Sequence, residues 1–304
     1  MGPFLNGGWG MRLLLIGKRG QLGWELERSL AALGEVTALS SADLDLVDPK
    51  AIRETVTRAK PDVILNAAAY TDVDRAELEP ELALSINGVA PGILAQAARD
   101  VGAGLIHYST DYVFDGRKDT PYSEEDPPAP INAYGRSKLE GERAIQRAGG
   151  VHVVLRTSWL YSLRRPGFPR QVLEWSRTQP VMRVVDDQQG SPTWSRMLAE
   201  ATAMLLARGD RDIVGWLGER AGVYHLAGEG RTSRFEWARA VLALDPRKEE
   251  QIVEQVLPAR ADEFPTAARR PANSSLCCDR FEETFGLRLP GWETSLRLAM
   301  EECK

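Results

Sequence analysis

The chain has 304 residues, of which 43% are hydrophobic and 27% charged, and its formal net charge at pH 7 is −5. This length allows one large domain or two ordinary domains. Without a long block of like charges, the composition argues against nucleic acid or a membrane surface as the main partner, and no apolar run approaches the ~20 residues of a membrane-spanning helix.

The two ends of the chain carry little functional signal. The first ten residues, MGPFLNGGWG, lack the basic start and apolar core of a signal peptide, so residues 1–10 are predicted to be a disordered leader. Three cysteines, Cys277, Cys278 and Cys303, lack the spacing typical of a disulfide or a metal site. A reduced, cytoplasmic protein is therefore expected.

A glycine-rich turn follows the first predicted strand. Residues 13–16 form an apolar run typical of a buried parallel strand. Gly17, Gly20 and Gly23 then give the pattern G-x-x-G-x-x-G at the start of a helix predicted over 24–33. Glycines let the backbone approach a pyrophosphate at a helix N-terminus. The pattern predicts a dinucleotide-binding turn.

The next strand bears on cofactor choice. It is predicted over 36–39 and ends at the neutral Ser40, whereas NAD-selective sites often place a carboxylate there. Lys18 and Arg19 lie within the glycine loop and suit a 2′-phosphate, which favours NADPH. Asp43 is close enough in sequence to act as the missing acid, so NADH stays possible.

Two loops further along the chain are candidates for cofactor contacts. Asp45 precedes Leu46 in a loop that can carry the adenine, although Asp45 and Asp48 can also cap the helix that starts at Pro49. A strand predicted over 63–65 leads into three alanines, which leave room for a ligand against the backbone. This second loop consists of Asn66, Ala67, Ala68, Ala69, Tyr70 and Thr71.

Residues 107–138 are predicted to hold the chemistry. A strand over 105–108 ends in hydroxyl residues, and after a Pro-rich loop a helix passes through Tyr134 and Lys138. These two residues are four apart, so they share one helix face. An ammonium group near a phenol lowers the pKa of the phenol, and Ser109 or Thr110 can donate to a substrate oxygen.

The order of elements predicts an α/β fold with a doubly wound parallel sheet (Rossmann-like) and a smaller C-terminal substrate-binding α+β domain. Residues 11–163 are assigned to the dinucleotide-binding domain, and 193–228 are expected to return to it. Residues 164–192 and 229–304 are assigned to the substrate domain. Trp159 ends a strand where it can stack on a sugar or a base, and Arg270 lies in a basic tail that can bind a diphosphate.

With these residues assembled, the sequence resembles the dTDP-4-dehydrorhamnose reductase family of the extended short-chain dehydrogenase/reductase superfamily. The resemblance runs from Met11 almost to the end of the chain. It rests on GKRGQLGWELERSL (17–30), PDVILNAAAYTDVDRAE (61–77), HYSTDYVFDG (107–116), YGRSKLEGE (134–142), RTSW (156–159), DQQGSPT (187–193) and ARRPANSSL (268–276).

The resemblance implies reduction of the C4 ketone of a dTDP-linked keto-sugar, with NADPH or NADH as cofactor. It implies that Tyr134 is the proton donor, that Lys138 tunes the phenol and holds the nicotinamide ribose, and that Thr110 assists. Positions expected at the cofactor are Gly17, Lys18, Arg19, Gly20, Gln21, Leu22, Gly23, Ser40, Asp45, Leu46, Ala67, Ala68, Ala69, Tyr70, Tyr108 and Lys138. Positions expected at the substrate are Thr71, Val73, Ser109, Thr110, Asp111, Tyr112, Trp159 and Arg270.

The family also implies a Mg²⁺ site that this chain departs from. Some members hold the ion with three glutamates where two subunits meet. Glu25 and Glu302 match two of these positions, but Arg196 occupies the third, and an arginine repels a cation. No metal is therefore expected, and the protein is expected to be a monomer or a homodimer.

Two other functions are compatible with the motifs. One is another sugar-nucleotide enzyme on the same scaffold, such as an epimerase or dehydratase that retains its cofactor. The other is a non-catalytic dinucleotide-binding module, as in the related regulatory subunit of methionine adenosyltransferase. The intact set of Thr110, Tyr134 and Lys138 favours the reductase.

Overall fold

The computed structural model describes residues 10–209 and 212–302. Residues 1–9 of the predicted leader and Cys303 therefore lie outside the described residues. The central element is a six-stranded sheet in the order β10-β5-β4-β3-β1-β2, in which all strand pairs are parallel. Its strands are β1 (Met11–Ile16), β2 (Gly34–Leu39), β3 (Val63–Asn66), β4 (Gly104–Thr110), β5 (His152–Thr157) and β10 (Gly222–His225).

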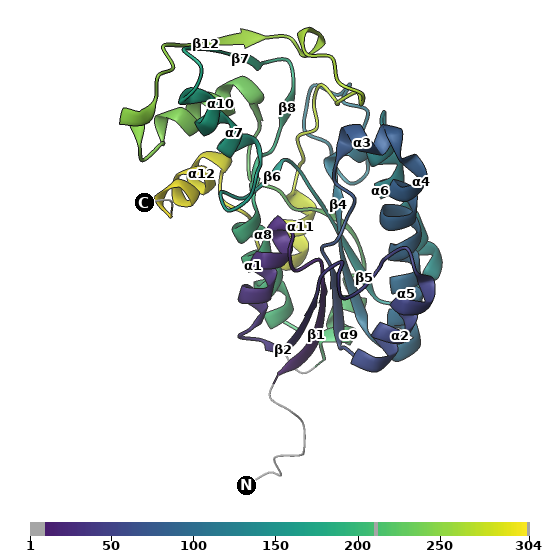
Figure 1. Cartoon of the computed structure of the whole chain (residues 1–304). Coiled ribbons are helices and arrows are strands. Elements are labelled where there is room, and N and C mark those ends of the chain that lie inside the picture. Colours follow the sequence, from purple (N-terminus) through teal and green to yellow (C-terminus); the bar gives the residue numbers. More distant parts are fainter. Residues whose placement is uncertain (1–9, 210–211, 303–304) are drawn as a thin grey trace.

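Helices cover both faces of this sheet, which confirms the predicted doubly wound fold (Figure 1). One face packs against α1 (Gln21–Leu30), α8 (Ser195–Ala207), α9 (Ile213–Gly218) and α11 (Asp279–Phe285). The other face packs against α2 (Pro49–Ala59), α5 (Ala90–Val101) and α6 (Ala133–Ala148). Strand side chains alternate between the two faces, so Leu13 and Leu15 join the first cluster and Leu14 and Ile16 the second.

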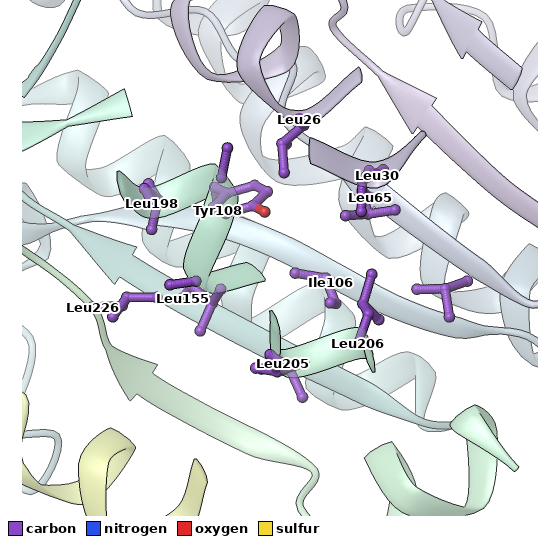
Figure 2. Close-up of a cluster of buried hydrophobic side chains, with 14 of the residues drawn as sticks. Leu26, Leu30, Leu65, Ile106, Tyr108, Leu155, Leu198, Leu205, Leu206 and Leu226 are labelled. Carbon is purple, nitrogen blue, oxygen red and sulfur yellow. The ribbon is translucent and has the colours of Figure 1, made fainter. Parts of the chain in front are cut away.

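Figure 2 shows how the first of these clusters joins distant parts of the chain. Leu26 and Leu30 of α1 and Leu205 of α8 lie in one cluster with Ile106 and Leu155 from the strands. All five side chains are fully buried. At roughly 1.5–3 kcal/mol for each buried side chain of this kind, such a cluster is a major source of the stability of the sheet.

A second group of elements has its own apolar cluster and lies beyond the carboxyl ends of the strands (Figure 1). It contains α7 (Phe168–Ser176), α10 (Arg234–Ala243), α12 (Trp292–Glu301) and the parallel pair β7 (Val181–Val185) with β12 (Gln255–Ala259). Two short pairs adjoin it: β6 (Leu160–Tyr161) with β9 (Thr193–Trp194), and β8 (Gln189–Gly190) with β11 (Thr232–Ser233). The remaining helices are α3 (Val73–Leu78), α4 (Pro80–Leu84) and a π-helical stretch η1 (Ser85–Val89), with 3-10 turns η2 (Asp111–Val113), η3 (Lys248–Glu250) and η4 (Ala261–Glu263).

Two expectations about the elements need correction. The first helix spans Gln21–Leu30 rather than 24–33, because extended Gly20 ends the turn and Gly23 lies inside the helix. A side chain at Gly23 would meet the carbonyl oxygen of Gly17 at 2.1 Å, so only glycine allows this contact. In addition, α11 packs on the main sheet, although it falls in the segment 229–304 assigned to the substrate domain. The division into domains otherwise stays a prediction.

Within the described ranges 10–209 and 212–302, no helix combines the length and the hydrophobicity required to span a membrane.

Candidate active site

The loops that follow β1, β3, β4 and β5 share one edge of the sheet. The register pairs Ile16 with Asn66, Asn66 with His107, and Thr110 with Thr157, so the carboxyl ends of the four strands lie side by side. Ligands of doubly wound sheets bind at this edge. The candidate residues of all four loops are therefore brought together by the fold.

The turn between β1 and α1 is shaped for a close ligand. Gly17 has φ +96°, and a side chain there would lie 2.7 Å from the backbone nitrogen of Ala68. Gly20 is exposed, and a side chain there would meet only the carbonyl of Gly17, at 3.3 Å. The turn thus packs against β3 at Gly17 while the backbone at Gly20 is open to a ligand.

The N-terminus of α1 has no acceptor of its own. Gly20 is the capping residue and provides no side-chain hydrogen bond, and no acidic residue stands in the first turn. Free amides and the helix dipole favour an anion at such an end. The residues present fit the pyrophosphate of a dinucleotide.

The charges near the end of β2 are partly paired. Lys18 Nζ lies 3.2 Å from the carboxylate of Asp43 and donates to the carbonyl of Ala38. The same carboxylate accepts from the backbone amide and hydroxyl of Ser40, and these bonds lower the pKa of Asp43 to about 2. Arg19 is exposed and forms no ion pair in the part of the chain that the structure describes. Arg19 is therefore the cation available to a ribose 2′-substituent.

Asn87 supports the alanine loop after β3, and the sequence reasoning missed it. Its side-chain oxygen accepts from the amide of Tyr70 at 2.8 Å, and its nitrogen donates to the Tyr70 carbonyl and to the hydroxyl of Ser137. It lies in the π-helical stretch η1, a conformation frequent at functional sites. Ala67, Ala68 and Ala69 are partly exposed, as required of a surface for a ligand.

Helix α6 presents Tyr134 and Lys138 at the same edge. Asn132 caps the helix by accepting from the amide of Gly135 at 2.7 Å. A side chain at Gly135 would lie 2.1 Å from the carbonyl oxygen of Tyr112, so glycine allows the helix to contact the loop after β4. The rings of Tyr134 and Tyr112 meet edge to face, with centroids 5.9 Å apart.

The expectation that Lys138 lowers the pKa of Tyr134 is wrong for this arrangement. Burial raises the pKa of the Tyr134 phenol well above its ordinary value, and an interaction with the Thr110 hydroxyl opposes this shift. Lys138 is turned into the protein, where its ammonium donates to the carbonyl of Tyr108 at 2.6 Å and lies 3.3 Å from Nε2 of His107. The phenol therefore keeps its proton at neutral pH.

Lys138 itself has an unusual environment. It is 1% exposed, and burial lowers its pKa to about 8, while Glu142 one turn along α6 opposes that shift. His107 is fully buried, its pKa is held low by burial and by Lys138, and its Nδ1 lies 3.1 Å from the Asn66 amide. His107 thus lies between the Asn66 amide and Lys138 and limits the position of the ammonium, a role that the sequence reasoning did not assign.

Ser109 does not join the group at the substrate side. Its hydroxyl donates to the buried carboxylate of Glu142 at 2.5 Å. That carboxylate also accepts two bonds from the guanidinium of Arg156, at 3.0 and 2.7 Å. Thr110, the next residue on β4, points away from this pair and interacts with Asp111 and Tyr134. Thr110 is therefore the hydroxyl placed beside the phenol.

Asp111 is buried beside Thr110, at the start of η2. Its carboxylate accepts from Thr110 at 3.0 Å and from Ser158 at 2.9 Å. Burial raises the pKa of Asp111 to about 6, and the hydrogen bonds oppose this rise. Val73 and Thr71 lie at the N-terminal end of α3, where Asp72 caps the helix through the amide of Arg75.

Trp159 and Arg270 both have protein partners. Trp159 has φ +42°, stacks on Trp237 with centroids 5.6 Å apart, and lies under the guanidinium of Arg234. Arg270 forms two bonds with Asp74, at 2.8 and 2.5 Å. The charge of Arg270 is thus paired with a carboxylate of the chain, and its role at a diphosphate stays a prediction.

Several residues expected at the cofactor present no free side chain. Leu22 belongs to the core, and the phenol of Tyr108 donates to Thr202 of α8, as its inward position in Figure 2 illustrates. Asp45 is exposed and accepts from the amide of Val47, whereas Asp48 caps α2. Leu46 is half-buried against the second cluster. These positions could meet a ligand mainly through their backbones.

The three positions of the family's metal site form an ion network in this chain. The guanidinium of Arg196 pairs with Glu25, Nε to Oε2 at 3.2 Å, and with Glu302. It thereby joins α1, α8 and the end of α12. A cation already stands between the carboxylates, so the donor set does not fit a divalent metal. Among the described residues, no cluster of three or more His, Cys, Asp or Glu suits a metal ion.

Comparison with known proteins gives a consistent result over almost the whole chain. A family model, "RmlD substrate binding domain", matches residues 11–304. The dTDP-4-dehydrorhamnose reductase of Burkholderia thailandensis is 43% identical over 295 residues, which cover 96% of this chain and 99% of that protein. The enzyme of that name from Escherichia coli K12 is 40% identical over 300 residues, covering 96% and 98%. A crystal structure of the Bacillus anthracis dTDP-4-dehydrorhamnose reductase in complex with NADP has a TM-score of 0.87 and 32% identity, covering 96% of this chain and 99% of that one.

Proposed function

The chain belongs to the dTDP-4-dehydrorhamnose reductase family, and from this premise we propose that it reduces the C4 ketone of dTDP-4-dehydro-L-rhamnose to give dTDP-L-rhamnose. It is an oxidoreductase of dTDP-rhamnose synthesis that uses NADP. The observation that carries the proposal is a sequence identity of 43% to a reductase of this name over 96% of this chain. Thr110, Tyr134 and Lys138 lie together at one edge of the sheet, as the reaction requires.

In this proposal Tyr134 gives its proton to the oxygen that was the ketone. Its raised pKa keeps the proton on the phenol before the reaction, and an alkoxide is basic enough to take it. The hydroxyl of Thr110 stabilises the negative charge that develops on that oxygen. The reduced nicotinamide supplies the hydride when it is bound.

Lys138 has a positioning role in this proposal. Its ammonium is held by the Tyr108 carbonyl and His107, one helical turn from Tyr134. These contacts fix the ammonium beside the strand end from which Thr110 projects, so its role is to shape the site rather than to shift the pKa of the phenol. It can also donate to the ribose of the bound cofactor, which is the role that the family implies.

The function is tested by following NADPH absorbance with dTDP-4-dehydrorhamnose as substrate. We expect one NADPH to be consumed for each dTDP-L-rhamnose formed. An epimerase or dehydratase retains its cofactor, so product without stoichiometric loss of NADPH would point to that activity instead. Absence of any ketone-dependent loss of absorbance would contradict the reductase proposal.

We propose that NADPH is preferred over NADH, and that Arg19 is the main cause. Charge-assisted hydrogen bonds are worth about 1.5–3 kcal/mol, so Arg19→Ala should reduce the ratio of kcat/KM for NADPH to that for NADH by at least tenfold. The values for NADH should change little. Arg12→Ala is a matched control, because Arg12 is exposed and pairs with Asp62 at the other end of β1. An unchanged ratio in Arg19→Ala would remove Arg19 from the 2′-phosphate site.

We propose that turnover needs no divalent metal, because Arg196 pairs with Glu25 and Glu302 where the family's ion would bind. An excess of EDTA should change kcat by less than about twofold. Added Mg²⁺ should not raise kcat either. A chelator-sensitive rate that Mg²⁺ restores would contradict this proposal. The cytoplasmic location and the monomer or homodimer state stay predictions.

A further inference from the structure

Arg234 lies at the edge of the candidate site, and its guanidinium stacks on aromatic side chains. It is the first residue of α10, and its guanidinium carbon lies 3.6 Å from the centroid of the Trp159 ring. Phe168 and Trp237 contribute further aromatic faces at 4.9 and 5.4 Å. Among residues 10–209 and 212–302 no ion pair includes Arg234, whereas Arg270 is paired with Asp74.

The surroundings of Arg234 connect it to the catalytic group. Burial is the main cause that lowers the pKa of the Arg234 guanidinium, and the charge of Arg270 lowers it further, whereas Asp111 and the Tyr112 hydroxyl oppose this shift. The ring of Tyr112 contacts Tyr134 edge to face at 5.9 Å. Tyr112 therefore lies between Arg234 and Tyr134, the proposed proton donor. Arg234 itself belongs to α10, in the second group of elements.

The platform under Arg234 is rigid. Trp159 adopts φ +42°, an uncommon conformation for a residue with a side chain. A side chain at Gly190 would lie 2.3 Å from the Trp159 ring, so the indole rests directly on the backbone of β8. That strand pairs with β11, whose last residue, Ser233, precedes Arg234. One local structure thus holds both the indole and the guanidinium.

We infer that Arg234 binds the diphosphate of the nucleotide-sugar substrate. This inference rests on the proposed function and names a group that holds its substrate. A half-buried guanidinium loses hydration, and Arg234 forms no direct ion pair within the described residues, so a bound diphosphate can supply a contacting anion. The planar guanidinium presents several donors in a fixed geometry that matches phosphate oxygens, and stacking on Trp159 orders it before the ligand arrives. Arg234 replaces Arg270 in this role, since Asp74 already compensates Arg270.

The experiment measures dTDP binding by calorimetry for the parent protein, Arg234→Met and Arg239→Met. Methionine keeps an unbranched apolar stem against Trp159 and removes the charge. Arg239→Met is the matched control, because Arg239 lies exposed on the same helix and pairs with Glu236. We expect Arg234→Met to weaken dTDP binding roughly 10- to 150-fold, with NADPH affinity within about twofold of the parent. The affinity of the parent for dTDP should fall with rising NaCl more steeply than that of Arg234→Met.

Binding of dTDP to Arg234→Met within threefold of the parent would overturn the inference. So would a loss of affinity with an unchanged salt dependence, because that result indicates a packing role toward Trp159. The assay requires no turnover, so the two proposals fail separately. A parent protein that binds dTDP through Arg234 but consumes no NADPH with the ketone would refute the reductase function alone.

Discussion

Replacement of Tyr134 by phenylalanine is expected to lower kcat by about 10²- to 10⁴-fold, the range that general acid catalysis contributes. The change removes one oxygen and its proton while the ring keeps its edge-to-face contact with Tyr112. The phenylalanine ring has no group that can give a proton to the substrate oxygen. NADPH affinity should change little, since Lys138 and the glycine turn are intact. The measurement is single-turnover oxidation of NADPH with the ketone, alongside fluorescence titration of NADPH.

The matched control for that experiment is Tyr224→Phe. Its hydroxyl donates to the carbonyl of Arg220, and its ring packs against Phe285 on the far side of β10. This variant loses the same atom from a core position, so its kcat should stay within about twofold of the parent. Turnover of Tyr134→Phe within threefold of the parent would refute the role of Tyr134 as proton donor.

Glu142→Gln is expected to lower the free energy of unfolding by about 3–5 kcal/mol. The Glu142 and Arg156 side chains are 2% and 5% exposed, and they form a two-bond ion pair between α6 and β5. Removing the carboxylate leaves a buried guanidinium next to His225, whose own pKa is lowered to about 3 by burial and by Arg156. His225 therefore stays neutral, and its imidazole offers no negative charge to pair with the guanidinium. The measurement is equilibrium unfolding in urea.

The comparison for this variant lies on the same helix. Glu140 pairs with Arg147 at the surface, where side chains are 36% and 63% exposed. Exposed pairs contribute about 0–1 kcal/mol, so Glu140→Gln should shift the unfolding free energy by less than about 1 kcal/mol. Equal effects of the two substitutions would show that burial does not set the strength of the inner pair.

The parallel sheet was predictable because its signals are local. Apolar runs such as 13–16 mark strands that are covered on both faces, and Asp48 with Pro49 marks the start of a helix. Helix boundaries differ from the prediction where a glycine can serve either a turn or a close contact inside a helix. The glycine pattern predicts Gly23 as part of the turn, yet it lies inside α1, because its missing side chain serves the contact with Gly17 rather than a bend.

The sequence predicts which residues are candidates for the site, but only some of the contacts that these residues make. Tyr134 and Lys138 share a helix face because they are four residues apart, and Thr110 ends the neighbouring strand. However, the partners of Lys138 come from β4, thirty residues earlier, so its inward turn to Tyr108 and His107 was not visible. The same is true of Arg270, which meets an aspartate 196 residues away.

By itself, the sequence determined the doubly wound fold, and it predicted the glycine turn for a dinucleotide and Tyr134 as the proton donor, because each depends on spacing between neighbours in the chain. Only the tertiary structure decided which arginines form ion pairs: Arg270 pairs with Asp74 and Arg196 with two glutamates, whereas Arg234 forms none among the described residues. Electrostatic pairing depends on distance in space and on exclusion of water. Both arise when distant segments pack together, so neither can be predicted from residues that are close in the sequence.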